Sequence, residues 1–307
     1  MSEQLDLFQD PDGPEAASAG LEGGGPAPDA GALDELFHRS AAWRTGEGLR
    51  RLLEFIARYP GYSPLNALLL FLQHPQATYV ATARGWERRH RRRLAPQARP
   101  LAILAPMSPV LFVYDLADTH GQPLPEAVLH PPEPTQRQLL KVYETTVHNC
   151  HVEGIAVREA PGPPPELGAV AQITPAQRKR SAHLNLDPGA RYLVLIDAGL
   201  GAAEKYAALV RELGHLFCGH LGIDGEAWWA DCKGLDLART ELEADSAAFL
   251  VCRRLGLERL ARPLLPRCSA GGPPIPPIGL NAVFQAVGHI EDMGRAPWRK
   301  PRRRSRY

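Results

Sequence analysis

The sequence predicts an α+β protein in two parts, a small N-terminal α+β domain and a larger α+β domain that carries its main motif on a helix. Both parts combine helical apolar periodicity with short strand-like runs. Proline-rich stretches at 131–134 and 161–165 interrupt regular structure near the start of the second part. The length of 307 residues suits one large domain or two small ones, and an apolar content of 44% is normal for a globular protein.

We expect four segments along the chain: an acidic disordered tail at 1–30, a first domain at 31–130, a second domain at 131–294 and a basic disordered tail at 295–307. The first tail is rich in Gly, Ala, Pro and Asp and lacks Lys and Arg. The last segment holds six Arg and one Lys. It would serve either as an arm that adds nonspecific affinity for phosphate or as a solubility tail.

Composition limits the classes of function. The net charge of +1 gives no global polyelectrolyte character. Five cysteines, an odd number without framework spacing, indicate reduced thiols in a cytosolic setting. The chain begins with no basic-plus-apolar signal and has no apolar run of 18 residues, so we expect a cytoplasmic protein with no membrane partner.

Each predicted element follows from a local pattern. In the first domain, apolar spacing predicts helices over 33–57 and 64–72, and strand-like runs occur at 78–82, 101–104 and 110–114. In the second domain, the pattern predicts helices over 135–150, 204–221, 240–255 and 280–293, with a buried strand over 191–197. Gly256 stands at a C-cap position and closes the third of these helices.

The motif Arg211-Glu-Leu-Gly-His215 lies on the predicted helix 204–221. In an H-E-x-x-H motif, two histidines four residues apart hold a metal, and the glutamate acts as general base on the metal-bound water. Glu212 and His215 stand where the base and the second ligand would be. Arg211 replaces the first ligand, and a guanidinium has no lone pair to offer a cation.

The helix 240–255 supplies further carboxylates. Glu241 and Asp245 are four residues apart on one face, as a third ligand and a carboxylate that orients the ligands would be. Glu243 is the competing choice for the ligand. It points about 160° away from the side of Asp245 at roughly 100° per residue.

Two residues beyond the motif are candidate replacement ligands. Cys218 lies three residues after His215 on the same side of the helix, and a thiolate binds zinc well. The alternative for Cys218 is a small buried apolar residue. His220 lies about 140° round the helix from His215, which makes it a poor replacement unless the helix ends first.

At these residues the chain resembles the ImmA/IrrE family of metallopeptidase-like proteins, over roughly 154–257. The resemblance rests on Glu212-Leu-Gly-His215 followed by Glu241-x-Glu243-Ala-Asp245-x-x-Ala248-x-Leu250. It implies a zincin-like domain whose intact members cleave a regulatory protein. It also implies that Glu212 is the base and that His215 and Glu241 are ligands, whereas Arg211 departs from the family pattern.

The first domain carries a dense basic run over 88–93. Asn66 near the start of an apolar helix, the basic run, the strand 111–115 and the series Thr119-x-Gly121-x-x-Leu124-Pro125 together resemble the N-terminal single-stranded-DNA-binding domain of ArdC-type antirestriction proteins. This resemblance implies that the basic run faces a nucleic-acid backbone.

Physical reasoning is compatible with that role, since single-stranded DNA is held by a cationic groove and aromatic faces. Tyr79 could also stack on a base. The alternative is a solvated hairpin loop with Trp86 in the core. The candidate contacts are Arg84, Trp86, Arg88, Arg89, Arg91, Arg92 and Arg93.

Two functions follow from these patterns. Arg211 favours a pseudopeptidase that binds single-stranded DNA or a protein partner without cleaving it and takes up zinc weakly. Glu212, His215, Glu241 and Asp245 favour the alternative, an active zinc-dependent endopeptidase that acts on a regulatory protein. In a metal-free site, we expect the guanidinium of Arg211 to lie against Glu241 or Glu212, because converging carboxylates repel one another.

Overall fold

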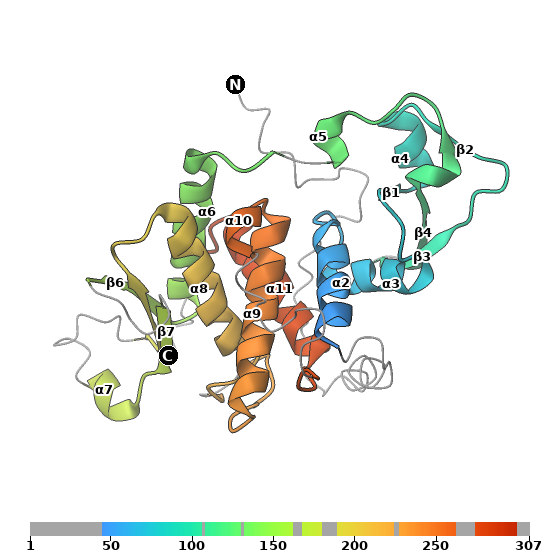
Figure 1. Ribbon diagram of the computed structural model, residues 1–307. Helices are drawn as coiled ribbons and strands as arrows, with labels where there is room; N and C mark the ends of the chain where they lie inside the picture. The colour runs from blue at the N-terminus through green and yellow to red at the C-terminus, as the bar shows by residue number, and fades with distance from the viewer. Residues whose placement is uncertain are drawn as a thin grey trace, which may run out of the picture.

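A computed structural model describes residues 45–105, 108–129, 132–161, 168–179, 189–223, 227–261 and 274–299. Within these ranges the chain combines helices with small sheets, which confirms the α+β class (Figure 1). The acidic segment 1–30, the first part of the helix predicted over 33–57, and residues 300–307 of the basic tail lie outside the described residues. No helix of the described part is long and apolar enough to cross a membrane.

The N-terminal elements follow the predicted order. Thr45 and Ser63 cap the first two helices, since each hydroxyl accepts a hydrogen bond from the main chain three residues on. A short helix over Ala83–Arg88 follows β1, and it was not predicted from this basic segment of the sequence. The elements are α2 (Gly46–Ala57), α3 (Pro64–Gln73), β1 (Val80–Ala81), α4 (Ala83–Arg88), β2 (Arg93–Leu94), β3 (Leu101–Ala105), β4 (Ser108–Asp115), η3 (Leu116–Asp118), β5 (Thr119–His120) and α5 (Glu126–Leu129).

These strands form two antiparallel sheets, one of order β1-β4-β3 and one in which β2 pairs with β5. The side-chain amide of Asn66 on α3 bonds both main-chain groups of Leu104 on β3. Strand alternation buries Leu101, Ile103 and Val113 on one face and leaves the other face more exposed.

The C-terminal elements surround a mixed three-stranded sheet of order β6-β8-β7. Its β6 is parallel to β8, and β7 is antiparallel to β8 at the edge. The elements are α6 (Gln136–Val152), β6 (Ile155–Ala160), β7 (Gly168–Gln172), α7 (Pro175–Lys179), β8 (Tyr192–Asp197), α8 (Ala202–Phe217), α9 (Leu237–Arg254), α10 (Glu258–Ala261) and α11 (Leu280–Arg295).

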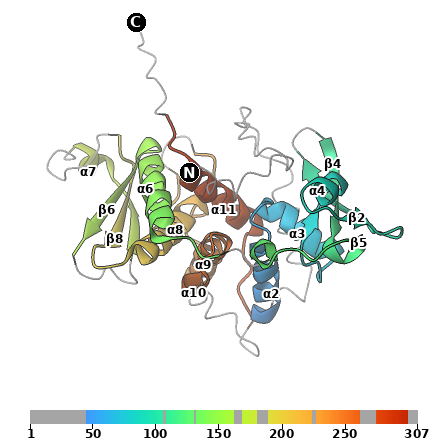
Figure 2. The same cartoon turned by 90° about the horizontal axis from the view of Figure 1, so that it is seen from above.

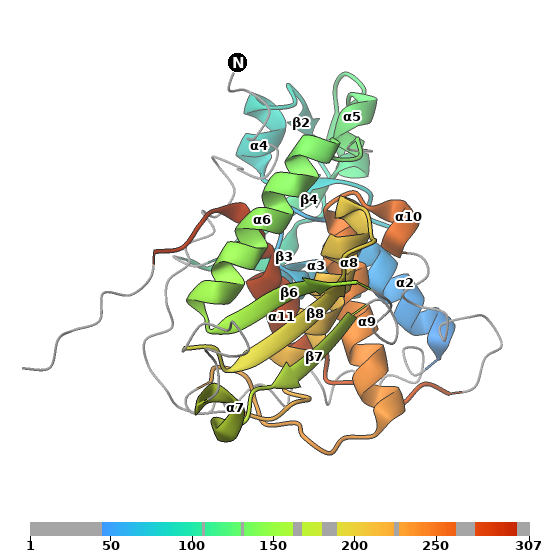
Figure 3. The same cartoon turned by 90° about the vertical axis from the view of Figure 1, so that its left-hand side faces the viewer.

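The elements are arranged in successive layers. Seen from above, the β6-β8-β7 sheet lies at one side, α6 and α8 lie beside it, and α9 and α11 come next (Figure 2). The helices α2 and α3 then connect this stack to the β1-β4-β3 sheet. In the side view, α6 runs along β6 while α8 lies behind the sheet (Figure 3). The motif helix α8 is thus held between the sheet and α9.

The two predicted parts share one hydrophobic core, whose buried residues extend from Leu49 on α2 to Met293 on α11. Arg254, at the end of α9 and 5% exposed, joins the parts by hydrogen bonds to the carbonyls of Ile56, Tyr59, Pro60 and Tyr62. Its charge is balanced by Glu291 on α11, at 2.6 Å from Nε. The turn between α2 and α3 is therefore anchored to α9, and through Glu291 to α11.

Candidate functional site: an arginine among carboxylates

Arg211 lies on α8 and faces α9, with its guanidinium surrounded by three carboxylates. Its Nε donates to Oδ1 of Asp245 at 2.9 Å, and Nη2 donates to Oε2 of Glu241. Nη1 lies 3.4 Å from Oε1 of Glu212. The expectation that the guanidinium lies against Glu241 or Glu212 is confirmed, and Asp245 is an additional partner.

This arrangement also confirms that Glu241 and Asp245 share one face of α9, because both bind the same guanidinium. His215 belongs to the same group, since its Nε2 lies 3.6 Å from Oε1 of Glu241. The carboxylates of Glu212, Glu241 and Asp245 therefore converge on one cation, which is the side chain of Arg211.

The electrostatics follow from partial burial. Desolvation disfavours the charged guanidinium, but Asp245, Glu241 and Glu212 outweigh it and raise the pKa of Arg211. Burial, together with the charge of Arg211 and the neighbouring His220, lowers the pKa of His215 to about 3. His215 is thus a neutral imidazole at physiological pH.

Glu212 lies at the contact between α8 and the sheet and is 3% exposed. A Cβ added at Gly168, the first residue of the edge strand β7, would lie 3.1 Å from Cγ of Glu212 and 3.2 Å from its Oε1. The glycine therefore lets β7 approach Glu212 closely. Among the described strands, β7 pairs only with β8, so no described strand pairs with its other edge.

The helix α8 ends at Phe217, four residues before the predicted end at 221. Gly219 adopts a left-handed φ of +80°, and its N–H donates to the carbonyl of Leu216 while the N–H of His220 donates to that of His215. Gly219 was the feature of the sequence that could have predicted this early end of the helix. The reversal brings Nδ1 of His220 within 3.1 Å of Nδ1 of His215, although 140° of helix would have separated them.

Three residues considered as ligands of the motif site form a second cluster instead. Cys218, His220 and Glu243 place one ligand-type atom each within 4.8 Å of one another. Glu243 is 1% exposed and binds His220 and Arg239, at 2.9 and 2.8 Å respectively. Cys218, a candidate replacement ligand with a buried apolar role as its alternative, is buried and lies with His220 and Glu243 and not with the ligands of the motif. This cluster is the only one of its kind in the described part of the chain.

The basic run of the first domain divides into buried and exposed side chains. Trp86 is fully buried and donates from Nε1 to the carbonyl of Tyr114 at 2.9 Å. Arg92 is 8% exposed and binds Thr119 through Nε at 2.7 Å and also the carbonyl of Gln122. The assignment of Trp86 and Arg92 to nucleic acid is therefore corrected, since both hold the fold together.

The remaining candidates lie at the surface, where Arg84, Arg88, Arg89, Arg91 and Arg93 are exposed. Tyr79 is half-buried and its hydroxyl lies 3.1 Å from Nε2 of His90. Alternation along β4 also exposes Phe112, at 54%, which no sequence pattern singled out. Its exposure follows from the register, in which neighbouring Val113 points into the core.

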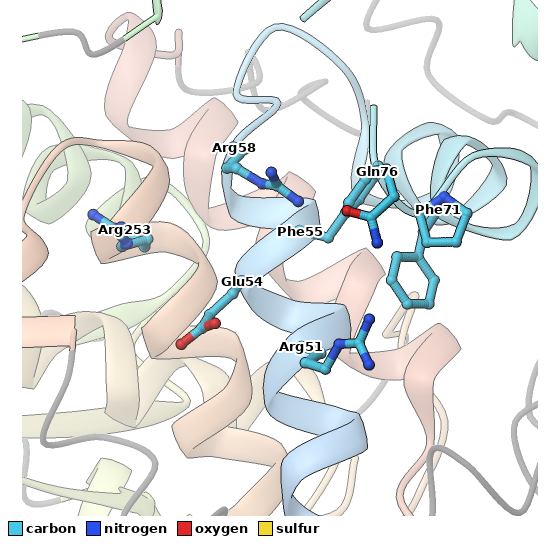
Figure 4. A pocket seen from close by; sticks show the side chains of 8 residues that line it. Arg51, Glu54, Phe55, Arg58, Phe71, Gln76 and Arg253 are labelled. Carbon is cyan, nitrogen blue, oxygen red and sulfur yellow. The ribbon is translucent and has the colours of Figure 1, made fainter. Parts of the chain in front are cut away.

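A separate hollow lies between α2 and the ends of α3 and α9, lined by Arg51, Glu54, Arg58, Phe71 and Arg253 among others (Figure 4). Its charged groups engage neighbouring side chains, since Arg253 pairs with Glu258 and the guanidinium of Arg58 lies over the ring of Phe55. None of the motif residues lines this hollow, so it is not part of the site around Arg211.

Comparisons of the chain with protein families, with curated proteins and with solved structures found no match.

Proposed function

We propose that the protein is a zincin-like pseudopeptidase that binds a protein partner without zinc-dependent cleavage. The observation that supports this most directly is the guanidinium of Arg211, which pairs with Glu212, Glu241 and Asp245. A catalytic zinc site has three protein ligands and an open position for water. Here a fixed cation occupies the space, one ligand is lost, and the would-be general base is held in an ion pair.

The edge strand β7 supports binding of an extended peptide. An unpaired strand edge offers main-chain donors and acceptors to a further strand, and specificity then comes from side chains beside it. Gly168 brings the face of this strand against Glu212, beside the carboxylates that hold Arg211, so its edge lies close to the motif. A segment of a protein partner added to β7 would therefore lie beside the motif without meeting a metal-activated water.

The test measures zinc-dependent hydrolysis of an unstructured protein such as casein. The wild type should show none, whereas Arg211→His supplies an imidazole four residues before His215. This variant should bind one more equivalent of zinc than the wild type, and any hydrolysis it gains should disappear in Arg211→His/Glu212→Gln. Hydrolysis by the wild type that is abolished by both a chelator and Glu212→Gln would establish the alternative, an active endopeptidase.

We propose that the first domain binds single-stranded DNA, for which the exposed face of the β1-β4-β3 sheet is the specific support. Phe112 is exposed on β4, and α4, which carries Arg84 and Arg88, packs on β1 and β4. An exposed aromatic ring with guanidinium groups on adjoining elements suits base stacking and phosphate contact. In this proposal Phe112 takes the stacking role for which Trp86 was a candidate.

Fluorescence anisotropy with an unstructured oligonucleotide tests this role. Log affinity should fall with log salt with a slope of about −0.7 per phosphate neutralised. Replacing Arg88, Arg89, Arg91 and Arg93 with Ser, while retaining Arg92, should flatten the slope without unfolding the domain. Absence of binding at about 50 mM salt, where phosphate contacts are strong, would refute the role.

A further inference from the structure

We propose that Cys218, His220 and Glu243 form a binding site for a divalent transition-metal ion of the zinc type, separate from the site around Arg211. The thiol, the imidazole and the carboxylate each offer one atom, and the three atoms lie within 4.8 Å of one another. Thiolate, imidazole and carboxylate are the ligand types that zinc takes in proteins.

Two rigid helices and one tight turn hold the three residues. Cys218 is the C-cap of α8 and Glu243 lies in the second turn of α9. Gly219 reverses the chain between Cys218 and His220, and a Cβ at this glycine would lie 2.0 Å from the carbonyl oxygen of Ala230. The close approach of the segment around Ala230 thus allows only glycine here, which fixes the direction of His220.

Each prospective ligand is oriented by contacts on its far side. Oε1 of Glu243 accepts from the main-chain N–H of Gly279 at 2.7 Å and from Nε of Arg239 at 2.8 Å. These bonds direct Oε2 toward Nε2 of His220, at 2.9 Å. The other ring nitrogen of His220 faces Nδ1 of His215. Support of this kind around ligating side chains is typical of metal sites, because it sets their orientation and tautomer.

The charges match a divalent ion. A thiolate and a carboxylate together carry two negative charges, so a bound divalent ion leaves no net charge among the ligands at a buried position. Cys218 and Glu243 are each 1% exposed, and the side chain of His220 is 4% exposed. Binding displaces the thiol proton to solvent, and any proton on Nε2 of a neutral His220 moves to Nδ1, so that the imidazole stays uncharged.

The alternative is that His220 and Glu243 are only a structural hydrogen-bonded pair, but such a pair does not need a thiol beside it. Of the four described cysteines, Cys218 alone lies in such a group, whereas Cys252 is equally buried on α9 without an imidazole and a carboxylate at this range. This contrast makes Cys252 the matched control. The motif residues His215 and Glu241 do not enter the cluster, so the site does not depend on the proposed pseudopeptidase function.

The experiment titrates Co²⁺ into reduced, chelator-treated protein and records absorption. One equivalent should produce a near-ultraviolet thiolate-to-cobalt charge-transfer band, which Zn²⁺ then bleaches by displacing cobalt. Cys218→Ala should lose the band and at least tenfold in affinity. Glu243→Gln should weaken binding but keep the band at saturating cobalt. Cys252→Ala and Asp245→Asn should keep both the band and the affinity, because Asp245 belongs to the site around Arg211 and not to this cluster.

The result that overturns the site is a wild type without the charge-transfer band at saturating Co²⁺, or a band that persists in Cys218→Ala. Circular dichroism of each variant establishes that it is folded before titration. If Cys218→Ala does not fold, Glu243→Gln decides the question, because an affinity equal to that of the wild type would remove Glu243 from the site and overturn the proposal.

Discussion

Arg211 on α8 donates from Nε to Oδ1 of Asp245 on α9 at 2.9 Å, and this ion pair joins the motif helix to α9. Arg211 stands at the first position of the motif, where an H-E-x-x-H sequence has a histidine. The side chains of Arg211 and Asp245 are 13% and 16% exposed, so the pair is largely removed from solvent.

Removing this charge should destabilise the fold. Arg211→Met leaves Glu212, Glu241 and Asp245 close together without a cation, and breaking a buried pair in this way costs about 3–5 kcal/mol. Urea denaturation at neutral pH measures the free energy of unfolding. Arg50→Met is the control, because the exposed pair of Arg50 with Glu54 contributes at most about 1 kcal/mol. Equal effects of the two variants would contradict a structural role for the buried pair.

The lowered pKa of His215 predicts a loss of stability in mild acid. The folded protein holds His215 neutral down to a pKa of about 3, whereas the unfolded chain binds its proton near the ordinary value of 6.5. The unfolded state therefore binds more protons between these values, and the free energy of unfolding falls as pH decreases from 6.5 toward 3. Chemical denaturation of chelator-treated protein across this range measures the slope. His215→Gln should show a shallower slope, and an unchanged slope would exclude His215 as its source.

Gly219 should tolerate no side chain. Gly219→Ala places a Cβ against the carbonyl of Ala230 and forces alanine to adopt a φ of +80°. Gly234→Ala is the matched control, because Gly234 has a φ of +90° with nothing within 4 Å of the added Cβ. The control should lose about 1 kcal/mol from backbone strain alone, and Gly219→Ala should lose more. Thermal unfolding compares them, and equal losses would show that the segment around Ala230 moves away readily.

Arg254 should be required for docking of α2 and α3 on the motif helices. Arg254→Met leaves Glu291 and several buried carbonyls without their donor, and loss of such a buried charge costs about 3–5 kcal/mol. Arg253→Met, one position earlier, removes a half-exposed partner of Glu258 and should change stability by about 1 kcal/mol or less. Hydrogen exchange of α2 should rise in the first variant alone.

Trp86 and Phe112 should respond in opposite ways to truncation. Trp86→Ala removes a fully buried indole and should destabilise the first domain by about 3–5 kcal/mol. Phe112→Ala removes an exposed ring, so the fold should remain while affinity for single-stranded DNA falls by about 1–3 kcal/mol for a stacked base. Stability and binding are measured on the same samples. Unchanged DNA affinity in Phe112→Ala would exclude the stacking role of this ring.

The features that the sequence predicted correctly depend on spacing within one element. The placement of Glu212 and His215 on α8, and of Glu241 and Asp245 on one face of α9, follows from helical periodicity alone. The position of Arg211 against these carboxylates was also predictable, because converging negative charges need a cation. Strands β3 and β4 and helix α11 were found near their observed bounds for the same local reason.

Tertiary structure decided which elements meet. The sequence left Trp86 open between the core and a nucleic-acid contact and predicted Arg92 as such a contact. Packing of Trp86 against β4 and hydrogen bonding of Arg92 to Thr119 bury both side chains. His220 reaches Glu243, 23 residues away, because Gly219 ends α8 early and α9 packs against its end. A repeat of about 3.6 residues specifies the face of one helix, but not the partner of that face. Contacts between distant segments arise from the collective burial of the core, which no local pattern encodes.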